Sequence, residues 1–259
     1  SPIPHLPLQA PKEWVDYYRN KIGPEKPYVG RSYYPNQYPK ATYAAMISYL
    51  DQQVGEIVEK LKEIGKYENT LIIFSSDNGP THIKHVDIDF FNSAGPFLNL
   101  ENTVKGNLNE GGIRVPTIVS WPDVIPSGSE SNHLSTFYDY LATVSDLVGA
   151  SPPYKTDGIS FLPTLKGKTQ EKHEYLYWEF PSYGGQQAIR IDKWKGIKKG
   201  LFKGSSKLKL YDLSVDSREL NDVASEHPDI VTKMEKMMKE AHKTPTMDIF
   251  KIPVLENDK

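Results

Sequence analysis

The chain has 259 residues, 38% of them hydrophobic, and a formal net charge of -2. A chain of this kind can bury a sizeable core, in one large domain or in two smaller ones. Acidic and basic residues nearly cancel, so we expect neither nucleic acid nor an anionic membrane as a partner. No stretch approaches the ~18 consecutive apolar residues of a membrane-spanning helix. The sequence contains no cysteine, which excludes disulfides, thiolate metal ligands and a cysteine nucleophile.

Helix patterns occupy separate parts of the chain before residue 150. Proline is frequent in residues 1–40, where we expect extended loop and one short helix at residues 12–21. Apolar residues at every third or fourth position predict a long helix over residues 41–65, which ends at Gly65. The same spacing predicts another helix over residues 135–148.

Two short segments between these helices have the composition of strands. Residues 71–74 form a continuous apolar run, which is typical of a strand buried on both faces of a parallel sheet. Residues 116–120 predict a second such strand. The alternation of helices with buried strands indicates the α/β class.

Beyond residue 158 the pattern changes to short aromatic strands separated by turns. We expect an antiparallel meander with strands at residues 175–180, 187–191, 194–198 and 208–211. A final helix at residues 228–242 carries isoleucine, valine and methionine side chains that would pack on this sheet. We interpret the basic residues 195–209 as a solvated strand face.

These elements predict an α/β fold that contains part of a mixed, mainly parallel sheet flanked by helices. A small antiparallel sheet with a C-terminal helix follows it. We expect residues 1–168 to belong to the first, α/β domain and residues 169–259 to form a small α+β domain.

Asp77 and Asn78 follow the strand at residues 71–74, at the strand end where ligands bind in open α/β sheets. Their side-chain oxygens suit a hard cation such as Ca²⁺, which takes about six to eight oxygen ligands. An ordinary Asp-Asn-Gly turn is the alternative interpretation.

Other polar residues are candidates for binding an anion or a substrate. Lys105 and Arg114 flank a glycine-rich loop whose backbone freedom could bring both cations to a common centre. A loop with solvated cations is the simpler interpretation. His5 and His82 are lone histidines, which are usually exposed side chains without a catalytic role.

A series of short segments runs in a fixed order through nearly the whole chain. They are residues 43–51, 69–80, 105–106, 110–116, 121–122, 157–163 and 210–213, followed by Asp216 and Glu219. This series closely resembles the formylglycine-dependent sulfatases, which are arylsulfatase-like members of the alkaline phosphatase superfamily. The resemblance implies that residues 1–168 are the C-terminal part of the sulfatase catalytic domain.

The resemblance implies a role for each candidate residue. Asp77 and Asn78 match calcium ligands, and Lys105 matches the lysine that binds the sulfate group. His5, in the segment His-Leu-Pro-Leu, matches a histidine that contacts the sulfate and assists departure of the alcohol. His82 is similar to a position that contacts the substrate in some members.

The nucleophile of the family is absent from the sequence. It is a formylglycine made from the first residue of a Cys-x-Pro-x-Arg or Ser-x-Pro-x-Arg segment, and the chain contains neither. We therefore expect the C-terminal part of a sulfatase, with an incomplete calcium site and no turnover by the chain alone. A natural non-catalytic module that binds sulfated glycans is the rival hypothesis. A truncated sheet would expose apolar surface, which predicts self-association.

The function implied for the whole protein is hydrolysis of a sulfate monoester, on a sulfated carbohydrate or an aryl sulfate. A phosphomonoesterase or phosphonate hydrolase of the same superfamily is the alternative. Residues 89–96 resemble bacterial sulfatases that act on carbohydrates. A periplasmic or secreted location is implied by the family alone.

Overall fold

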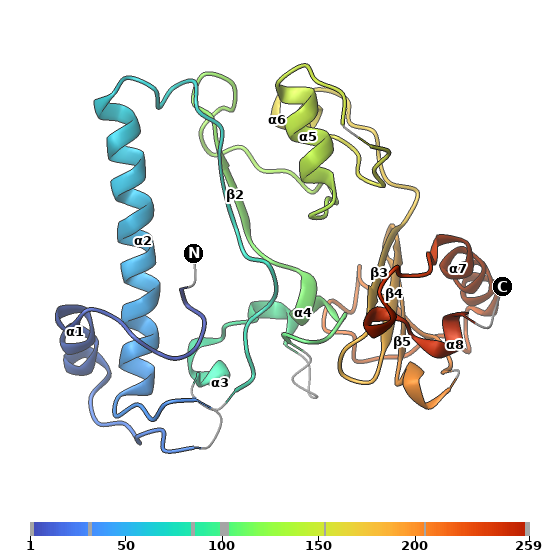
Figure 1. Ribbon diagram of the computed structural model, residues 1–259, viewed down its shortest axis with the longest axis horizontal. Helices are drawn as coiled ribbons and strands as arrows, with labels where there is room; N and C mark the ends of the chain where they lie inside the picture. The colour runs from blue at the N-terminus through green and yellow to red at the C-terminus, as the bar shows by residue number, and fades with distance from the viewer. Residues whose placement is uncertain are drawn as a thin grey trace. The chain divides into compact units, whose positions relative to one another are not determined.

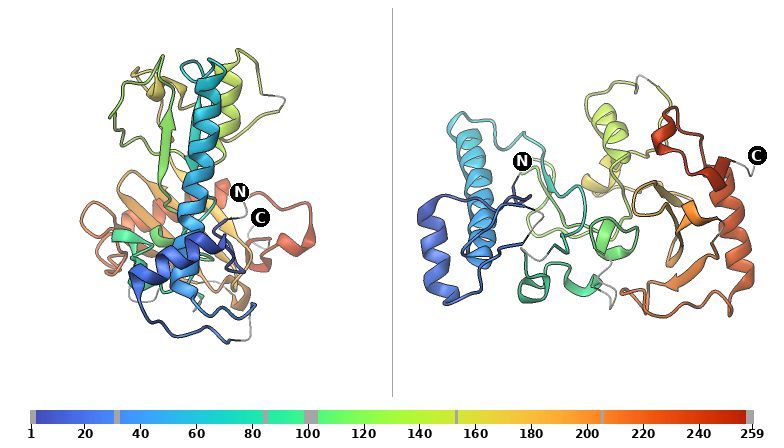
Figure 2. Two further views of the ribbon diagram at one scale, coloured as in Figure 1. Left: turned by 90° about the vertical axis from the view of Figure 1, so that its left-hand side faces the viewer. Right: turned by 60° about the horizontal axis from the view of Figure 1, so that its bottom comes forward.

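The computed structural model describes residues 3–30, 33–83, 86–98, 104–152, 154–204 and 206–256. The chain divides into two compact units, one of Ser1–Ile72 with Pro80–Gly95 and the other of Ile73–Gly79 with Pro96–Lys259. Figures 1 and 2 show the course of the chain. The expected domain boundary after residue 168 stays a prediction.

The first unit is built on two helices (Figure 1). α1 (Lys12–Ile22) packs against α2 (Pro39–Glu63), and both agree with the helices expected from the sequence. The Trp14 indole donates to Gln52 at 3.1 Å, which links the two helices. The hydroxyls of Tyr18 and Ser48 form a second link at 2.5 Å.

The core of the first unit covers only the start of α2. A cluster of Leu6, Leu8, Met46 and Val86 is buried, and the buried residues of α2 all lie in its first two turns. Further along the helix, Ile57 is 60% exposed. The short α3 (Ile88–Phe91) begins where the Asp87 carboxylate accepts from the Phe90 amide at 3.0 Å.

β1 (Ile72–Ser75), which belongs to the second unit from Ile73 on, and β2 (Thr117–Ser120) form a two-stranded sheet. Beyond the strands, Gly79 donates to the Gly112 carbonyl at 2.9 Å, and the Ser75 hydroxyl donates to the Pro116 carbonyl at 3.1 Å. From Ser75 to Gly79 the chain moves forward, while the partner residue moves back from Pro116 to Gly112. The two segments are therefore antiparallel where they meet. The α/β class is confirmed, and parallel pairing of these two strands is not found.

The expectation that both strands are buried on both faces is wrong. Phe74 is 37% exposed and Ile118 is 64% exposed. An apolar run shows that a strand can be buried on both faces. Burial also requires other elements that pack on each face.

The helices between β1 and β2, and those between β2 and the C-terminal sheet, are short. α5 (Asp139–Leu147) lies within the helix expected over residues 135–148 but begins four residues later. The buried Asp139 carboxylate accepts from the Thr136 amide at 2.8 Å. η1 (Gly95–Phe97), α4 (Glu110–Ile113) and α6 (Leu162–Leu165) were not predicted. Each spans about one turn, which is too short to show helical periodicity.

Four antiparallel strands in sequential order form what we call the C-terminal sheet, and they confirm the expected meander. They are β3 (Leu176–Phe180), β4 (Gln186–Ile191), β5 (Trp194–Lys199) and β6 (Lys209–Asp212). α7 (Pro228–Ala241) packs Met234, Met237 and Met238 against Ile189 and Leu210 of this sheet, as expected (Figure 1).

The remaining short elements are η2 (Leu201–Lys203), η3 (Asp248–Phe250) and α8 (Pro253–Glu256). None of the described helices is both long enough and apolar enough to span a membrane.

Candidate functional site

The loop after β1 packs directly on the turn that precedes β2. A Cβ atom added to Gly79 would lie 2.0 Å from the Gly111 carbonyl oxygen, so only glycine fits at this position. The Gly79 amide donates to the Gly112 carbonyl at 2.9 Å. This close approach fixes Asp77 and Asn78 beside the segment that carries Lys105.

Asp77, Asn78 and Lys105 line one pocket of about 260 Å³ within the second unit. The other residues that line it are Gly106, Asn107, Leu108, Gly112, Ile113, Phe180 and Tyr183. Asp77 is exposed, whereas Asn78 and Lys105 are half-buried. The structure therefore brings together three of the five site residues expected from the sequence.

The oxygens of Asp77 and Asn78 fit one side of a calcium site. The Asn78 amide nitrogen donates to the Gly79 carbonyl at 3.1 Å, which leaves its side-chain oxygen for another partner. Calcium needs about six to eight oxygens. Among the described residues there is no group of three or more histidines or carboxylates arranged to hold a metal. These two residues can supply only part of such a site.

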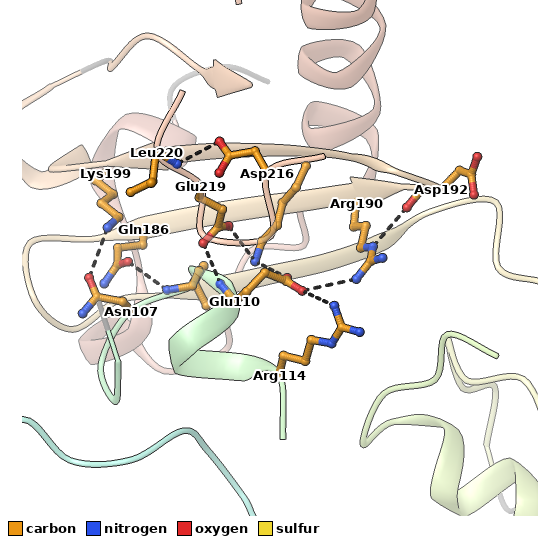
Figure 3. Close-up of polar contacts among 12 residues, drawn as sticks. Asn107, Glu110, Arg114, Gln186, Arg190, Asp192, Lys199, Asp216, Glu219 and Leu220 are labelled. Carbon is orange, nitrogen blue, oxygen red and sulfur yellow. Dashed lines mark hydrogen bonds and ion pairs between the residues drawn. The ribbon is translucent and has the colours of Figure 1, made fainter. Parts of the chain in front are cut away.

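The Lys105 loop, defined here as residues 104–109, is hydrogen-bonded to the C-terminal sheet (Figure 3). The buried Gln186 amide donates to the Gly106 carbonyl at 2.8 Å and accepts from the Leu108 amide at 3.2 Å. The Lys199 ammonium donates to the Asn107 side-chain oxygen at 3.1 Å. The strand register of the sheet thus sets the conformation of the loop on both sides of Asn107.

Buried ion pairs anchor the end of the same loop (Figure 3). Glu110 begins α4 and is 2% exposed, and its carboxylate lies 2.7 Å from the Lys195 ammonium of β5. Glu219 lies 3.1 Å from the same ammonium and accepts from the Glu110 amide at 2.8 Å. Arg114 and Arg190 approach the other Glu110 oxygen at 3.3 and 3.5 Å.

Lys195 corrects one interpretation of the sequence. We interpreted the basic residues 195–209 as a solvated strand face, but the Lys195 side chain is 0% exposed. Its burial is possible because two carboxylates satisfy the ammonium inside the protein.

The charges around Glu110 shift its acidity. Burial raises the pKa of this carboxyl, but the attraction of Lys195, Arg190 and Arg114 outweighs burial and holds the pKa below its ordinary value. Burial also lowers the pKa of Arg190 despite its proximity to Glu110. Glu110 is therefore an ionised anchor of the loop.

Phe180 and Tyr183 line the pocket, and sequence reasoning missed both. Phe180 ends β3, and Tyr183 lies in the turn between β3 and β4. The aromatic strand pattern predicted residues 175–180 but gave no reason to connect the turn with Lys105. The available signal was an aromatic residue beside the glycine pair Gly184-Gly185, within a turn.

His5 and His82 lie in the first unit, so the structure does not relate them to the pocket. Both side chains are exposed. The His5 Nδ1 atom lies 2.8 Å from the Leu6 carbonyl oxygen, and the ring meets Tyr33 edge-on with centroids 6.4 Å apart. Their roles stay predictions.

Comparison with known proteins assigns the chain to a family. The family described as sulfatase matches residues 3–150, and the family described as N-sulphoglucosamine sulphohydrolase, C-terminal, matches residues 104–244. The first match covers more than half of the chain. The chain belongs to the sulfatase family.

Two curated relatives illustrate the similarity. An uncharacterized sulfatase of Schizosaccharomyces pombe is 28% identical over 307 aligned residues, which cover 89% of this chain and 54% of the relative. The N-acetylglucosamine-6-O-sulfatase of Bacteroides thetaiotaomicron is 27% identical and covers 84% of this chain and 38% of its own length. The chain thus spans about half or less of the length of these two relatives.

Solved structures support the same fold. The crystal structure of Ps i-CgsB superposes with a TM-score of 0.72 at 29% identity, over 92% of this chain and 48% of that one. A second structure of that protein contains k-i-k-neocarrahexaose. The phosphonate monoester hydrolase of Agrobacterium radiobacter superposes with a TM-score of 0.58 at 24% identity over 77% of this chain and 40% of that one, which shows a shared fold.

Proposed function

We propose that this chain supplies part of the active site of a sulfuric ester hydrolase that acts on sulfated carbohydrates. The observation that carries the proposal is the shared pocket of Asp77, Asn78 and Lys105. A cation and two oxygen ligands at one site suit a substrate that carries an anionic group, held partly through a metal.

In this proposal, Asp77 and Asn78 hold one side of a Ca²⁺ ion. Bound calcium would neutralise charge on the sulfate oxygens. Lys105 donates hydrogen bonds to the same sulfate group and stabilises charge that develops on it. Gln186, Glu110 and Lys195 touch no substrate, and they position Lys105 through the loop.

We further propose that His5 donates a proton to the departing alcohol and that His82 contacts the substrate. In the doubly protonated His5 ring, Nδ1–H would donate to the Leu6 carbonyl 2.8 Å away, and Nε2–H would be the group that gives its proton to the departing alcohol. In this way a local backbone contact would select the ring nitrogen that works in catalysis.

The nucleophile would come from a formylglycine outside this sequence, so we expect no turnover by the chain alone. A carbohydrate substrate is supported by two relatives, namely the N-acetylglucosamine-6-O-sulfatase and the structure with bound neocarrahexaose. We also propose, from the family alone, that the complete protein works in the periplasm or outside the cell.

The test is a comparison of aryl sulfate and aryl phosphate hydrolysis by the complete protein. We expect faster hydrolysis of the sulfate, and removal of calcium by a chelator should abolish it. Asp77→Ala should lower the calcium affinity, whereas Asp123→Ala, which changes an exposed carboxylate that does not line the pocket, should leave it unchanged. Preference for the phosphate ester would instead favour the alternative hypothesis, a phosphomonoesterase or phosphonate hydrolase.

A further inference from the structure

The pocket of Asp77, Asn78 and Lys105 has an aromatic side for which the proposed sulfate chemistry gives no role. The rings of Phe180 and Tyr183 are stacked, with centroids 5.9 Å apart and an angle of 26° between the planes. Both residues line the pocket. One pocket therefore combines polar groups with an apolar aromatic wall.

The two rings are supported differently. Phe180 packs against the buried cluster that contains Leu108, Ala188 and Tyr211, which makes it a fixed base. Tyr183 is 70% exposed, so most of its surface is open to a ligand. A large aromatic side chain that is exposed but supported from one side is typical of binding surfaces, because little conformational entropy is lost when a ligand covers it.

The Tyr183 ring lies beside Gly106, the residue that follows Lys105. The residue has φ +52, in the left-handed region that is unfavourable for residues with a side chain. The ring lies against Gly106, where an added Cβ would come within 2.9 Å of it. Gly106 itself has φ +89, so glycine is required here both by conformation and by space.

We propose that Tyr183, supported by Phe180, stacks on the sugar ring of the sulfate ester and makes the pocket selective for saccharide substrates. The inference rests on the proposed function, since the sulfate group would occupy the side lined by Asp77, Asn78 and Lys105. A pyranose ring presents a face of C–H groups together with hydroxyls, and tyrosine offers both an apolar ring and a hydroxyl. Inorganic sulfate has no apolar face that could stack on these rings, so it would use only the polar side of the pocket.

The experiment is calorimetric titration of the complete protein, with its formylglycine nucleophile replaced by alanine to prevent turnover, in the presence of calcium, with inorganic sulfate and with a panel of monosulfated hexoses. At least one sulfated hexose should bind roughly 10-fold more tightly than inorganic sulfate. In Tyr183→Ala the ratio of the affinity for the sulfated hexose to the affinity for inorganic sulfate should fall about 5- to 10-fold. The affinity for inorganic sulfate itself should stay within about twofold. Tyr183→Phe should retain most of the advantage.

Tyr154→Ala is the matched control, because Tyr154 is 68% exposed and does not line the pocket. It should leave both affinities unchanged, and the circular dichroism spectrum should be the same for all variants. Sulfate binding without any sulfated hexose binding more tightly would overturn the inference alone. An equal loss of affinity for both ligands in Tyr183→Ala would also overturn the inference, because it indicates that Tyr183 has a structural role. Binding of neither ligand by the unsubstituted complete protein would overturn the proposed function as well.

Discussion

Lys195 and Glu110 form a buried ion pair that joins the C-terminal sheet to the start of α4, directly after the Lys105 loop, with 2.7 Å between the ammonium nitrogen and a carboxylate oxygen. Lys195 also pairs with Glu219 at 3.1 Å, so one buried cation faces two carboxylates. Such an arrangement has one favourable geometry, because any displacement leaves a charge without its partner in the protein interior. The pair therefore holds the pocket segment that ends at Glu110 in a fixed position relative to β5.

Replacing this buried cation should be strongly destabilising. Lys195→Met leaves the carboxylates of Glu110 and Glu219 buried near each other without their shared partner. We expect a loss of about 3–5 kcal/mol in the free energy of unfolding, measured by urea denaturation. Lys243→Met is the control, since Lys243 and Asp157 are 74% and 72% exposed, and it should change the free energy by less than about 1 kcal/mol. A loss in Lys195→Met no larger than the control would contradict this role.

The stability of the chain should fall in acid through Glu110. Its pKa in the folded protein lies below the ordinary value of 4.5, because the attraction of Lys195 and the arginines outweighs burial. A carboxylate of this kind stabilises the folded state above its unfolded pKa, and this contribution is lost as the pH falls through the lower, folded pKa. The free energy of unfolding should therefore decrease as the pH is lowered from about 4.5. The decrease should be smaller in Glu110→Gln. Equal pH profiles of the free energy of unfolding in the two proteins would contradict the assignment of this acid sensitivity to Glu110.

Gly79 should not tolerate a side chain. In Gly79→Ala, the added Cβ would meet the Gly111 carbonyl oxygen at 2.0 Å, so the loop that carries Asp77 must move. We expect lower stability and weaker calcium binding, measured by denaturation and calorimetry. Gly55→Ala is a control of opposite sign, because nothing lies within 4 Å of its added Cβ in the interior of α2. It should stabilise by about 0.5–1 kcal/mol.

The chain should associate with itself through the exposed strand face of β2. Ile118 is 64% exposed, and exposed apolar strand residues favour pairing with another copy. In sedimentation velocity the mean sedimentation coefficient should rise with concentration, and Ile118→Lys should reduce this rise. Val215→Lys, at an 86% exposed position outside the strands, should have no effect. A monodisperse monomer at all concentrations would refute the prediction.

Periodicity in the sequence was sufficient for the large elements. α2 and α7 repeat apolar residues along one face, and β3 to β6 are short aromatic segments separated by turns, so the pattern itself specifies the structure. α4 could not be predicted in this way because it has four residues. The orientation of β1 and β2 also has no local signal, since an apolar run is compatible with either direction.

The candidate site shows the same division between local and distant information. Asp77, Asn78 and Lys105 came from short motifs, and the structure places them in one pocket. The burial of Lys195 depends on Glu110, which lies 85 positions away in the sequence, so the local pattern of lysines suggested solvent instead. The contribution of Tyr183 likewise depends on how the C-terminal sheet packs on the Lys105 loop.

The most direct test of the central claim is the effect of Lys105→Ala on kcat/KM for an aryl sulfate, measured with the complete protein. Loss of one preorganised charge at the sulfate should lower this value about 100- to 1000-fold. Lys203→Ala, which removes an exposed lysine that does not line the pocket, should leave it unchanged. An unchanged rate in Lys105→Ala would contradict the assignment of this pocket as the sulfate site.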